Sequence, residues 1–249
     1  MAVRSEILKR FHLWGVRILA LVLLTLLKMS ADAQDFYTDY GAILQAEYQI
    51  GIEKYLGLPL RNDKIDITVK EDLRFEDNVS KYSRSKTTLG IDYRFVRWGL
   101  KIGVGFDYIN RYTEKFIYRN RYRYFINVSY KYDLKNFELG YRTRFITMYN
   151  DENTGYYNYE AHYYWRNRLS VSYHHSFSRF KYTLSGETYS FFDRDRTLQL
   201  EELMFEGDVE YRLTRRQYLS AFVRDYKAIY IESDKIRTVY FGIGWRYKH

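Results

Sequence analysis

The feature of this sequence that most restricts its fold is a strict alternation of apolar and polar residues, which recurs along most of the chain. In residues 121–132 every second side chain is aromatic or aliphatic, and the others are mostly basic or polar. Successive side chains of a β-strand point to opposite sides of the sheet, so the pattern predicts a strand with one apolar and one polar face. A polar turn at Asp133–Asn136 follows, and the alternation then resumes at Phe137. Together the two runs predict a β-hairpin.

The length of these strands points to a membrane. A run of about twelve residues exceeds the ~5–6 residues usual in soluble sheets and matches the ~9–11 residues with which a tilted strand crosses a bilayer. The mean hydropathy of −0.53 alone would suit a soluble protein. However, half of each strand in a membrane barrel faces a polar interior, which keeps the average low. We therefore predict an all-β fold, a transmembrane antiparallel up-and-down β-barrel.

Residues 1–33 differ from the rest of the chain. Basic residues precede an apolar run at Ile18–Leu27, which ends near the small residues of Ala31-Asp32-Ala33. This order is typical of a secretory signal peptide, cleaved here before Gln34. A membrane-anchor helix is the alternative, but the run is shorter than the ~20 residues that a spanning helix needs. The chain has no cysteine, so we expect neither a lipidated N-terminus nor a disulfide, and we assign residues 34–249 to the barrel.

Eleven candidate strands follow the leader, joined alternately by short turns and longer polar loops. Single-chain bacterial barrels have even strand numbers, so we expect about ten strands, with residues 34–63 forming an N-terminal segment partly outside the wall; two merged strands would give twelve. The strand after Tyr218 has no clear phase, because Leu219 and Val223 compete with Phe222 and Tyr226 for the outward side.

The connections predict an orientation. Outer-membrane barrels have short periplasmic turns and longer extracellular loops. This asymmetry places the chain in the outer membrane of a Gram-negative bacterium, with outer-membrane lipids, periplasmic chaperones and the barrel-assembly machinery as expected partners. The short turns are expected at residues 97–99, 133–136, 176–179 and 214–217, and the longer loops include residues 76–86 and 111–120.

The inward face carries charges of both signs. A barrel of about ten strands has an interior little wider than its side chains, so these charges are expected to pair across it, because unpaired charges in a confined interior are costly. A structural, salt-bridged plug is the first interpretation, and a narrow pore that prefers anions is the second. The expected inward charges are Asp66, Lys70, Asp72, Arg74, Asp92, Arg94, Lys101, Asp107, Arg121, Arg123, Glu138, Arg142, Arg144, Arg166, Arg168, Glu187, Asp208, Glu210 and Arg212.

A second set of cations is expected in the longer loops. Removing the leader leaves 35 basic and 29 acidic residues, a net charge of +6. The loop cations either form a solvated surface or bind phosphates of the outer-leaflet glycolipid, for which the bidentate geometry of arginine is suited. They are Lys81, Arg84 and Lys86; Arg111, Lys115, Arg119 and Arg121; Arg194 and Arg196; and Lys227, Lys235 and Arg237.

Other function classes find little support in the sequence. Nucleic-acid binding is not expected, because alternation separates the tyrosines from the arginines, whereas base stacking needs both on one face. A lipid-modifying outer-membrane enzyme would need a serine activated by histidine. Ser170, Ser172, His174, His175 and Ser176 lie on one strand, but any strand with these residue types would show such a cluster. No motif for a metal or cofactor is present, so we assign no catalytic, cofactor-binding or metal-binding residues.

Two short motifs resemble known patterns. Tyr240, Gly242, Trp245 and Tyr247 in the last strand resemble the C-terminal β-signal of outer-membrane proteins, although Lys248-His249 extend beyond the final aromatic residue. The stretch Leu73-Arg74-Phe75-Glu76-Asp77-Asn78 resembles the family called domain of unknown function 2490. That resemblance covers most of the mature chain and implies an exported outer-membrane barrel, without implying an activity.

Overall fold

The computed structural model describes residues 37–52, 63–112, 118–150, 161–175, 177–192, 197–229 and 236–249. The predicted signal peptide and most of the predicted long loops lie outside these residues. Eleven strands and one short 3-10 helix are described. They are β1 (Tyr37–Gly51), β2 (Lys64–Glu76), β3 (Lys81–Phe95), η1 (Val96–Trp98), β4 (Leu100–Tyr112), β5 (Tyr118–Leu134), β6 (Phe137–Asn150), β7 (Ala161–His174), β8 (Phe180–Phe192), β9 (Leu198–Arg212), β10 (Gln217–Ala228) and β11 (Ile236–Lys248). Within the described residues, no helix is long and apolar enough to span a membrane.

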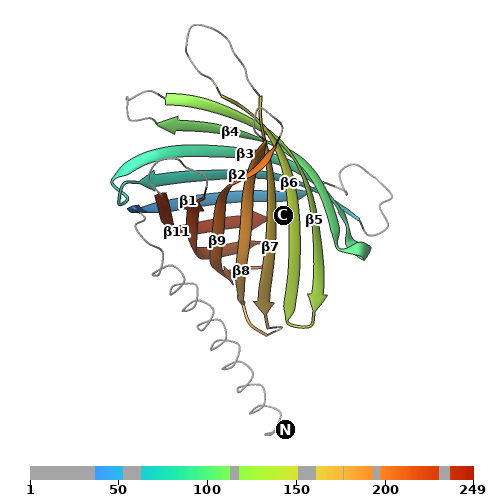
Figure 1. Ribbon diagram of the computed structural model, residues 1–249. Helices are drawn as coiled ribbons and strands as arrows, with labels where there is room; N and C mark the ends of the chain where they lie inside the picture. The colour runs from blue at the N-terminus through green and yellow to red at the C-terminus, as the bar shows by residue number, and fades with distance from the viewer. Residues whose placement is uncertain are drawn as a thin grey trace. The chain divides into compact units, whose positions relative to one another are not determined.

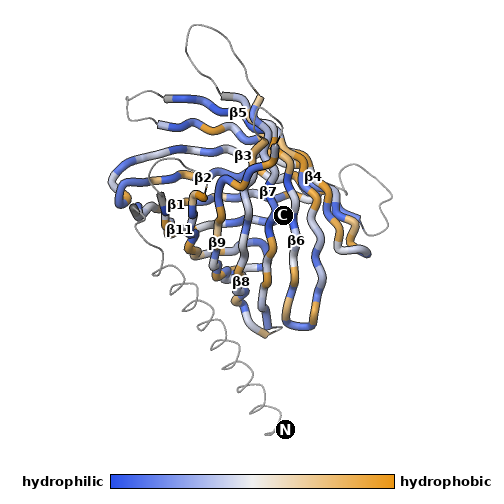
Figure 2. The backbone as a smooth tube through the Cα atoms, in the orientation of Figure 1, coloured by the Kyte–Doolittle hydropathy of each residue, from blue (hydrophilic) through white to orange (hydrophobic). Residues whose placement is uncertain are grey.

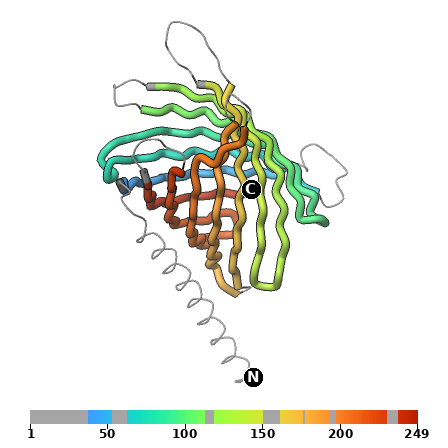
Figure 3. Tube along the Cα trace, viewed as in Figure 1, coloured from blue at the N-terminus to red at the C-terminus, as the bar shows by residue number. Residues whose placement is uncertain are grey.

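The strands form a closed barrel, which confirms the predicted fold class. From β1 to β11 each strand pairs antiparallel with the next one in the chain (Figure 1). Figure 3 shows the chain passing around the wall in sequence order until β11 returns beside β1. Closure leaves no open sheet edge, so the backbone groups of the strands find partners within the wall.

The expected even number of strands is wrong, because β1 belongs to the wall. β1 and β11 pair in parallel through thirteen register partners, from Tyr37↔Ile236 to Gln49↔Lys248. An odd number of strands makes the closing pair parallel, since every other neighbouring pair is antiparallel. The rings of Tyr48 and Tyr247 stack across this pair, with centroids 5.5 Å apart and planes 1° apart. Ile43 in β1 is fully buried on the inner face. Residues 37–51 of the segment that we expected partly outside the wall therefore form one of its strands.

The short turns lie where the alternation predicts them, but one predicted loop is much shorter. β3 begins at Lys81, and a turn at Asp77–Ser80 replaces the loop expected at residues 76–86. Asp77, Asn78 and Val79 have positive φ angles, and the backbone N–H groups of Asp77 and Asn78 each donate to the carboxylate of Asp39 at 3.1 Å. The start of β3 escaped prediction because its residues 81–86 lack an alternating apolar set.

Hydrophobic and hydrophilic residues alternate along the strands in Figure 2, and the burial of their side chains shows that the two faces of the wall differ as the alternation predicts. Ile91, Val104 and Ile126 follow one another in register on the outer face and are 51%, 52% and 55% exposed. The structure also shows which side of β10 faces inward, because Phe222 and Tyr226 are buried inside whereas Leu219 and Val223 are exposed outside.

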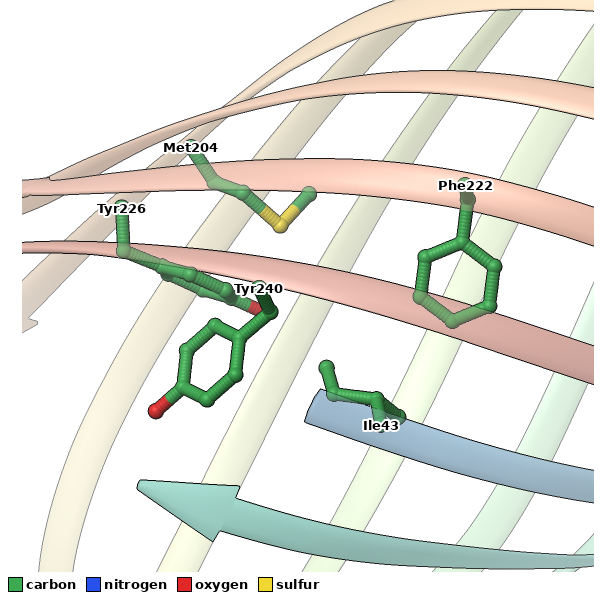
Figure 4. Close-up of a cluster of buried hydrophobic side chains, with 5 residues drawn as sticks. All are labelled: Ile43, Met204, Phe222, Tyr226 and Tyr240. Atoms are coloured by element: carbon green, nitrogen blue, oxygen red, sulfur yellow. The ribbon is translucent and has the colours of Figure 1, made fainter. Parts of the chain in front are cut away.

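A small apolar cluster fills part of the interior next to the closing pair. It consists of Ile43, Met204, Phe222, Tyr226 and Tyr240, which come from β1, β9, β10 and β11 (Figure 4). Gly41 and Gly242 make room for its rings. A Cβ atom at Gly41 would lie 2.5 Å from the ring of Tyr240, and one at Gly242 would clash with the ring of Phe222.

Candidate functional site

The interior of the barrel is the candidate site, because it gathers most of the buried charge. Asp66, Asp72, Arg74, Asp107 and Glu187 are each at most 7% exposed, on the inward face that the sequence predicts. Arg212 differs from the prediction, since it lies exposed at the end of β9. Buried charges need hydrogen-bonded partners of opposite sign, so the arrangement of these partners determines what the interior can do.

Three buried carboxylates at mid-height each hold two cations. Asp72 and Glu206 each face one cation with each oxygen, whereas Glu187 holds two arginines on one oxygen, and three of the six pairs join neighbouring strands. The pairs are Asp72 with Lys86 (2.6 Å) and Lys70 (3.7 Å), Glu187 with Arg142 (2.9 Å) and Arg166 (2.9 Å), and Glu206 with Arg168 (2.5 Å) and Arg224.

A second layer of ion pairs lies at the short-turn end. Its members come from the first or last residues of their strands, and their cations are more exposed than most of those at mid-height. The pairs are Asp66 with Arg94 (2.8 Å), Asp92 with Lys101 (3.0 Å), Glu138 with Lys131 (2.7 Å) and Lys181 (3.2 Å), and Glu210 with Arg246 (2.5 Å). The predicted pairing of inward charges is therefore confirmed for these groups, although they pair along the wall and not across the diameter.

A cavity of about 340 Å³ remains inside the barrel. Eleven of its lining residues are lysine or arginine and five are aspartate or glutamate, an excess of six cations. The three mid-height networks contribute six of the cations and three of the acids. The other two acids, Glu201 and Glu202, form no ion pair with described residues. The cavity thus has an excess of positive charge, and its three central carboxylates already form ion pairs with two cations each.

Four of the cavity arginines have no carboxylate partner among the described residues. The side chain of Arg84 makes no hydrogen bond or ion pair with described residues. Arg123 donates from Nε to the sulfur of Met148 at 3.4 Å, and Arg144 donates from Nε to Oδ1 of Asn127 at 2.5 Å. Arg74 donates from Nη2 to the hydroxyl of Tyr226 at 3.5 Å and lies over the rings of Tyr226 and Tyr240 at 5.6 and 5.3 Å.

Aromatic and apolar side chains also line the cavity, next to Arg74. Tyr226 and Tyr240 meet edge to face, with ring centroids 5.5 Å apart, and point toward one another in Figure 4. The hydroxyl of Tyr240 donates to Glu76 at 2.6 Å, which connects β11 to β2 across β1. Met204 lies beside them and also lines the cavity. The site therefore combines guanidinium groups with an apolar surface.

The predicted loop cations separate into three groups. Lys81, Arg84 and Lys86 belong to β3, and Arg84, Lys86 and Arg121 line the cavity. Arg111 and Arg119 are exposed register partners at the long-loop ends of β4 and β5, and Lys227 and Arg237 lie in β10 and β11. Lys115, Arg194, Arg196 and Lys235 lie outside the described residues.

Arg84, Lys86 and Arg224 are interior residues that the sequence analysis missed. The inward series Gly90, Asp92, Arg94, read backward at every second position, reaches Thr88, Lys86 and Arg84. Extending that series into the expected loop at residues 76–86 would have predicted that Arg84 and Lys86 face the interior. Arg224 shares its face with Phe222 and Tyr226, so it required the phase that the sequence left open.

The serines and histidines of β7 do not assemble into a nucleophile and a base. Ser172 shares a hydrogen bond with Thr183 at 2.9 Å, and Ser170 donates to the carbonyl of Gly140 at 3.4 Å. The Nδ1 atom of His175 accepts from the backbone of Phe177 at 3.4 Å, and Ser176 lies outside the described residues. Across the described part of the chain, no hydrogen bond joins a serine side chain to a histidine side chain, and no group of three metal-binding side chains occurs.

Comparison of the chain with protein-family models gives no match, and comparison with curated proteins gives none.

Proposed function

We propose that this chain is an outer-membrane protein of a Gram-negative bacterium, whose barrel crosses the bilayer and acts as a structural barrel with a charged interior. The observation that carries the proposal is the inside-out distribution of its residues. Apolar side chains such as Leu89, Ile126 and Ile243 are about half exposed, while carboxylates such as Asp72 and Glu187 are almost fully buried. Exposed apolar area on this scale marks a surface that contacts protein or lipid, and a continuous belt around a barrel suits lipid.

Aromatic residues at the short-turn end support the same proposal. Membrane barrels carry girdles of aromatic side chains where the apolar belt meets the headgroups. Trp98, Tyr132, Phe137, Phe177 and Trp245 all lie near this end and are 40–90% exposed. The short turns at this end suggest the periplasmic side.

The interior is proposed to be closed to steady ion flow. An eight-stranded barrel is filled by its own side chains, whereas a sixteen-stranded porin leaves a water channel. With eleven strands, this barrel is closer in diameter to the filled barrel than to the porin. The ion pairs of the short-turn layer narrow that end further. We expect reconstituted protein to give no steady conductance in planar bilayers. Large steps that are stable under voltage would refute the closed interior.

A narrow anion-preferring pore is the second candidate, because the cavity lining has eleven cations against five acids. Rings of arginine and lysine favour anions in a pore. The same bilayer experiment separates the two candidates: a pore would give small steps whose reversal potential in a salt gradient follows the anion. Fractionation tests the location itself, since recovery of the chain in a detergent-free soluble fraction would contradict membrane insertion.

Outer-membrane lipids are the partners that the apolar belt suggests, and glycolipid phosphates are a narrower proposal. Arg111 and Arg119 support it, because they are exposed and adjacent at the long-loop end. Basic groups near an anionic membrane surface contribute about 1 kcal/mol each to binding. We expect the R111S/R119S variant to retain less glycolipid during purification while it still shows heat-modifiable migration. Unchanged retention by the folded variant would leave the pair as solvated surface groups.

The last strand supports biogenesis by the barrel-assembly machinery with periplasmic chaperones. Trp245 and Tyr247 face outward on β11, and Gly242 faces inward, as the alternation predicts. Membership in the family called domain of unknown function 2490 stays a proposal that rests on residues 73–78.

A further inference from the structure

The interior holds more positive charge than the described residues neutralise. Arg74, Arg84, Arg123 and Arg144 line one cavity and have no carboxylate partner within the described residues. Arg74 and Arg84 are direct register partners on the inner face, a placement in which like charges repel. The Nε atom of Arg142, in the same lining, is also buried without a partner. Guanidinium groups in a confined interior are costly unless they are paired, so this arrangement favours an anion from outside the chain.

Among the described residues, few acids remain that could neutralise these arginines. Asp72, Glu187 and Glu206 each already bind two cations. Glu201 and Glu202 line the cavity without forming an ion pair there, and counting them still leaves six more cations than acids. A rotation of either side chain could neutralise one arginine, but not the whole set. The positive excess is therefore a property of the cavity and not of one side chain.

The size and chemistry of the cavity define the ligand. A volume of about 340 Å³ is at the small end of the ~300–1,000 Å³ range of small-molecule sites. Guanidinium groups bind carboxylate and phosphate oxygens in a bidentate manner, and several of them together favour a multivalent anion. Tyr226, Met204 and Ile109 supply an apolar surface for a carbon skeleton.

We propose that the cavity binds a small molecule that carries two or more oxyanion groups, either carboxylates or phosphates. Arg74, Arg84, Arg123 and Arg144 bind these groups, and the aromatic side of the cavity contacts the rest of the molecule. The inference goes beyond the proposed function and does not depend on whether the barrel conducts, because it concerns a site inside the described wall. Binding can therefore succeed or fail independently of the location and conductance experiments.

Calorimetric titration of the full chain in lipid-free detergent micelles tests the proposal. Citrate and pyrophosphate serve as the carboxylate and phosphate probes, in sodium chloride of matched ionic strength. We expect saturable binding of at least one of them, and the probe that binds more tightly identifies the oxyanion. The bound probe should also raise the unfolding temperature of the wild-type chain with increasing concentration, a measurement that needs no variant.

Two double variants with the same loss of charge locate the site. We expect R84Q/R123Q to weaken binding at least tenfold, and R97Q/R216Q, which removes two exposed arginines from the short turns, to change it less than twofold. Without anion, R84Q/R123Q should unfold at a temperature no lower than that of the wild type, because it loses repulsion and no ion pair. The proposal is overturned if neither probe binds the folded wild type, if both double variants weaken binding equally, or if R84Q/R123Q binds like the wild type.

Discussion

Replacing Glu187 by glutamine is expected to lower the free energy of unfolding by about 3–5 kcal/mol, the usual cost of removing one partner from a buried ion pair. The side chain of Glu187 is 1% exposed, and its Oε1 atom accepts from both Arg142 and Arg166 at 2.9 Å. Glutamine keeps the size but leaves two guanidinium groups without a counter-charge, in a cavity that already has an excess of cations. Urea unfolding in lipid vesicles, followed by tryptophan fluorescence, measures the loss.

Glu138 provides the matched control for this substitution. Its Oε1 atom also holds two cations, Lys131 at 2.7 Å and Lys181 at 3.2 Å, but it lies at the short-turn end and Lys131 is 56% exposed. Water screens such a pair, so E138Q should cost no more than about 1 kcal/mol. Equal losses in the two variants would show that the mid-height networks are as hydrated as the end of the barrel, and would remove the argument for a closed interior.

Replacing Ile126 by arginine is expected to destabilise the barrel in lipid by about 2–4 kcal/mol, the range for a basic residue facing lipid at the bilayer midplane. Ile126 lies at the centre of β5, is 55% exposed, and has Val104 and Phe145 as its register partners on the outer face. A soluble barrel would tolerate an exposed arginine here within about 0.5 kcal/mol. The sign and size of the effect therefore report whether the outer face contacts lipid.

Leu134 is the control position on the same strand and face. It ends β5 near the short turn and is 44% exposed. Near the interface the cost of an outward arginine falls to about 0–1 kcal/mol, so L134R should unfold almost like the wild type. Vesicle unfolding of both variants measures the depth dependence. A flat result, in which I126R and L134R cost the same small amount, would contradict the proposed membrane insertion.

Alternation predicts the parts of the fold that depend on one strand at a time. It identifies the two faces of β2, β4, β5 and β11 and the positions of the short turns, because side-chain direction has a period of two in any strand. It fails where the pattern is interrupted. Residues 81–86 of β3 lack an alternating apolar set, so the sequence did not predict where β3 begins. β10 has aromatic residues on its inner face, so the sequence did not predict which of its faces points inward.

Pairing between strands is a different kind of information. The cluster of unpaired arginines depends on register: Arg74 and Arg84 face one another only because a four-residue turn follows β2 and the register shifts between Arg74 and Phe75. Likewise, the number of strands depends on whether β1 pairs with β11, and the residues of β1 alternate equally well in either case. The sequence therefore supports the charged interior as a class of site, whereas the composition of its cavity follows from the closed wall.

The parallel closing pair also restricts how the connectivity of the strands could be changed by circular permutation. In a barrel with an even number of strands, the first strand begins at the same end of the barrel at which the last strand ends. A short linker can then join the two, and new termini can be made in another loop. Here β1 begins beside Ile236 and β11 ends beside Gln49, twelve register positions away. At about 3.3 Å per residue, that separation is on the order of 40 Å. Circular permutation of this barrel thus needs a linker of at least about twelve residues that runs the full height of the wall, through its interior or along its outer face.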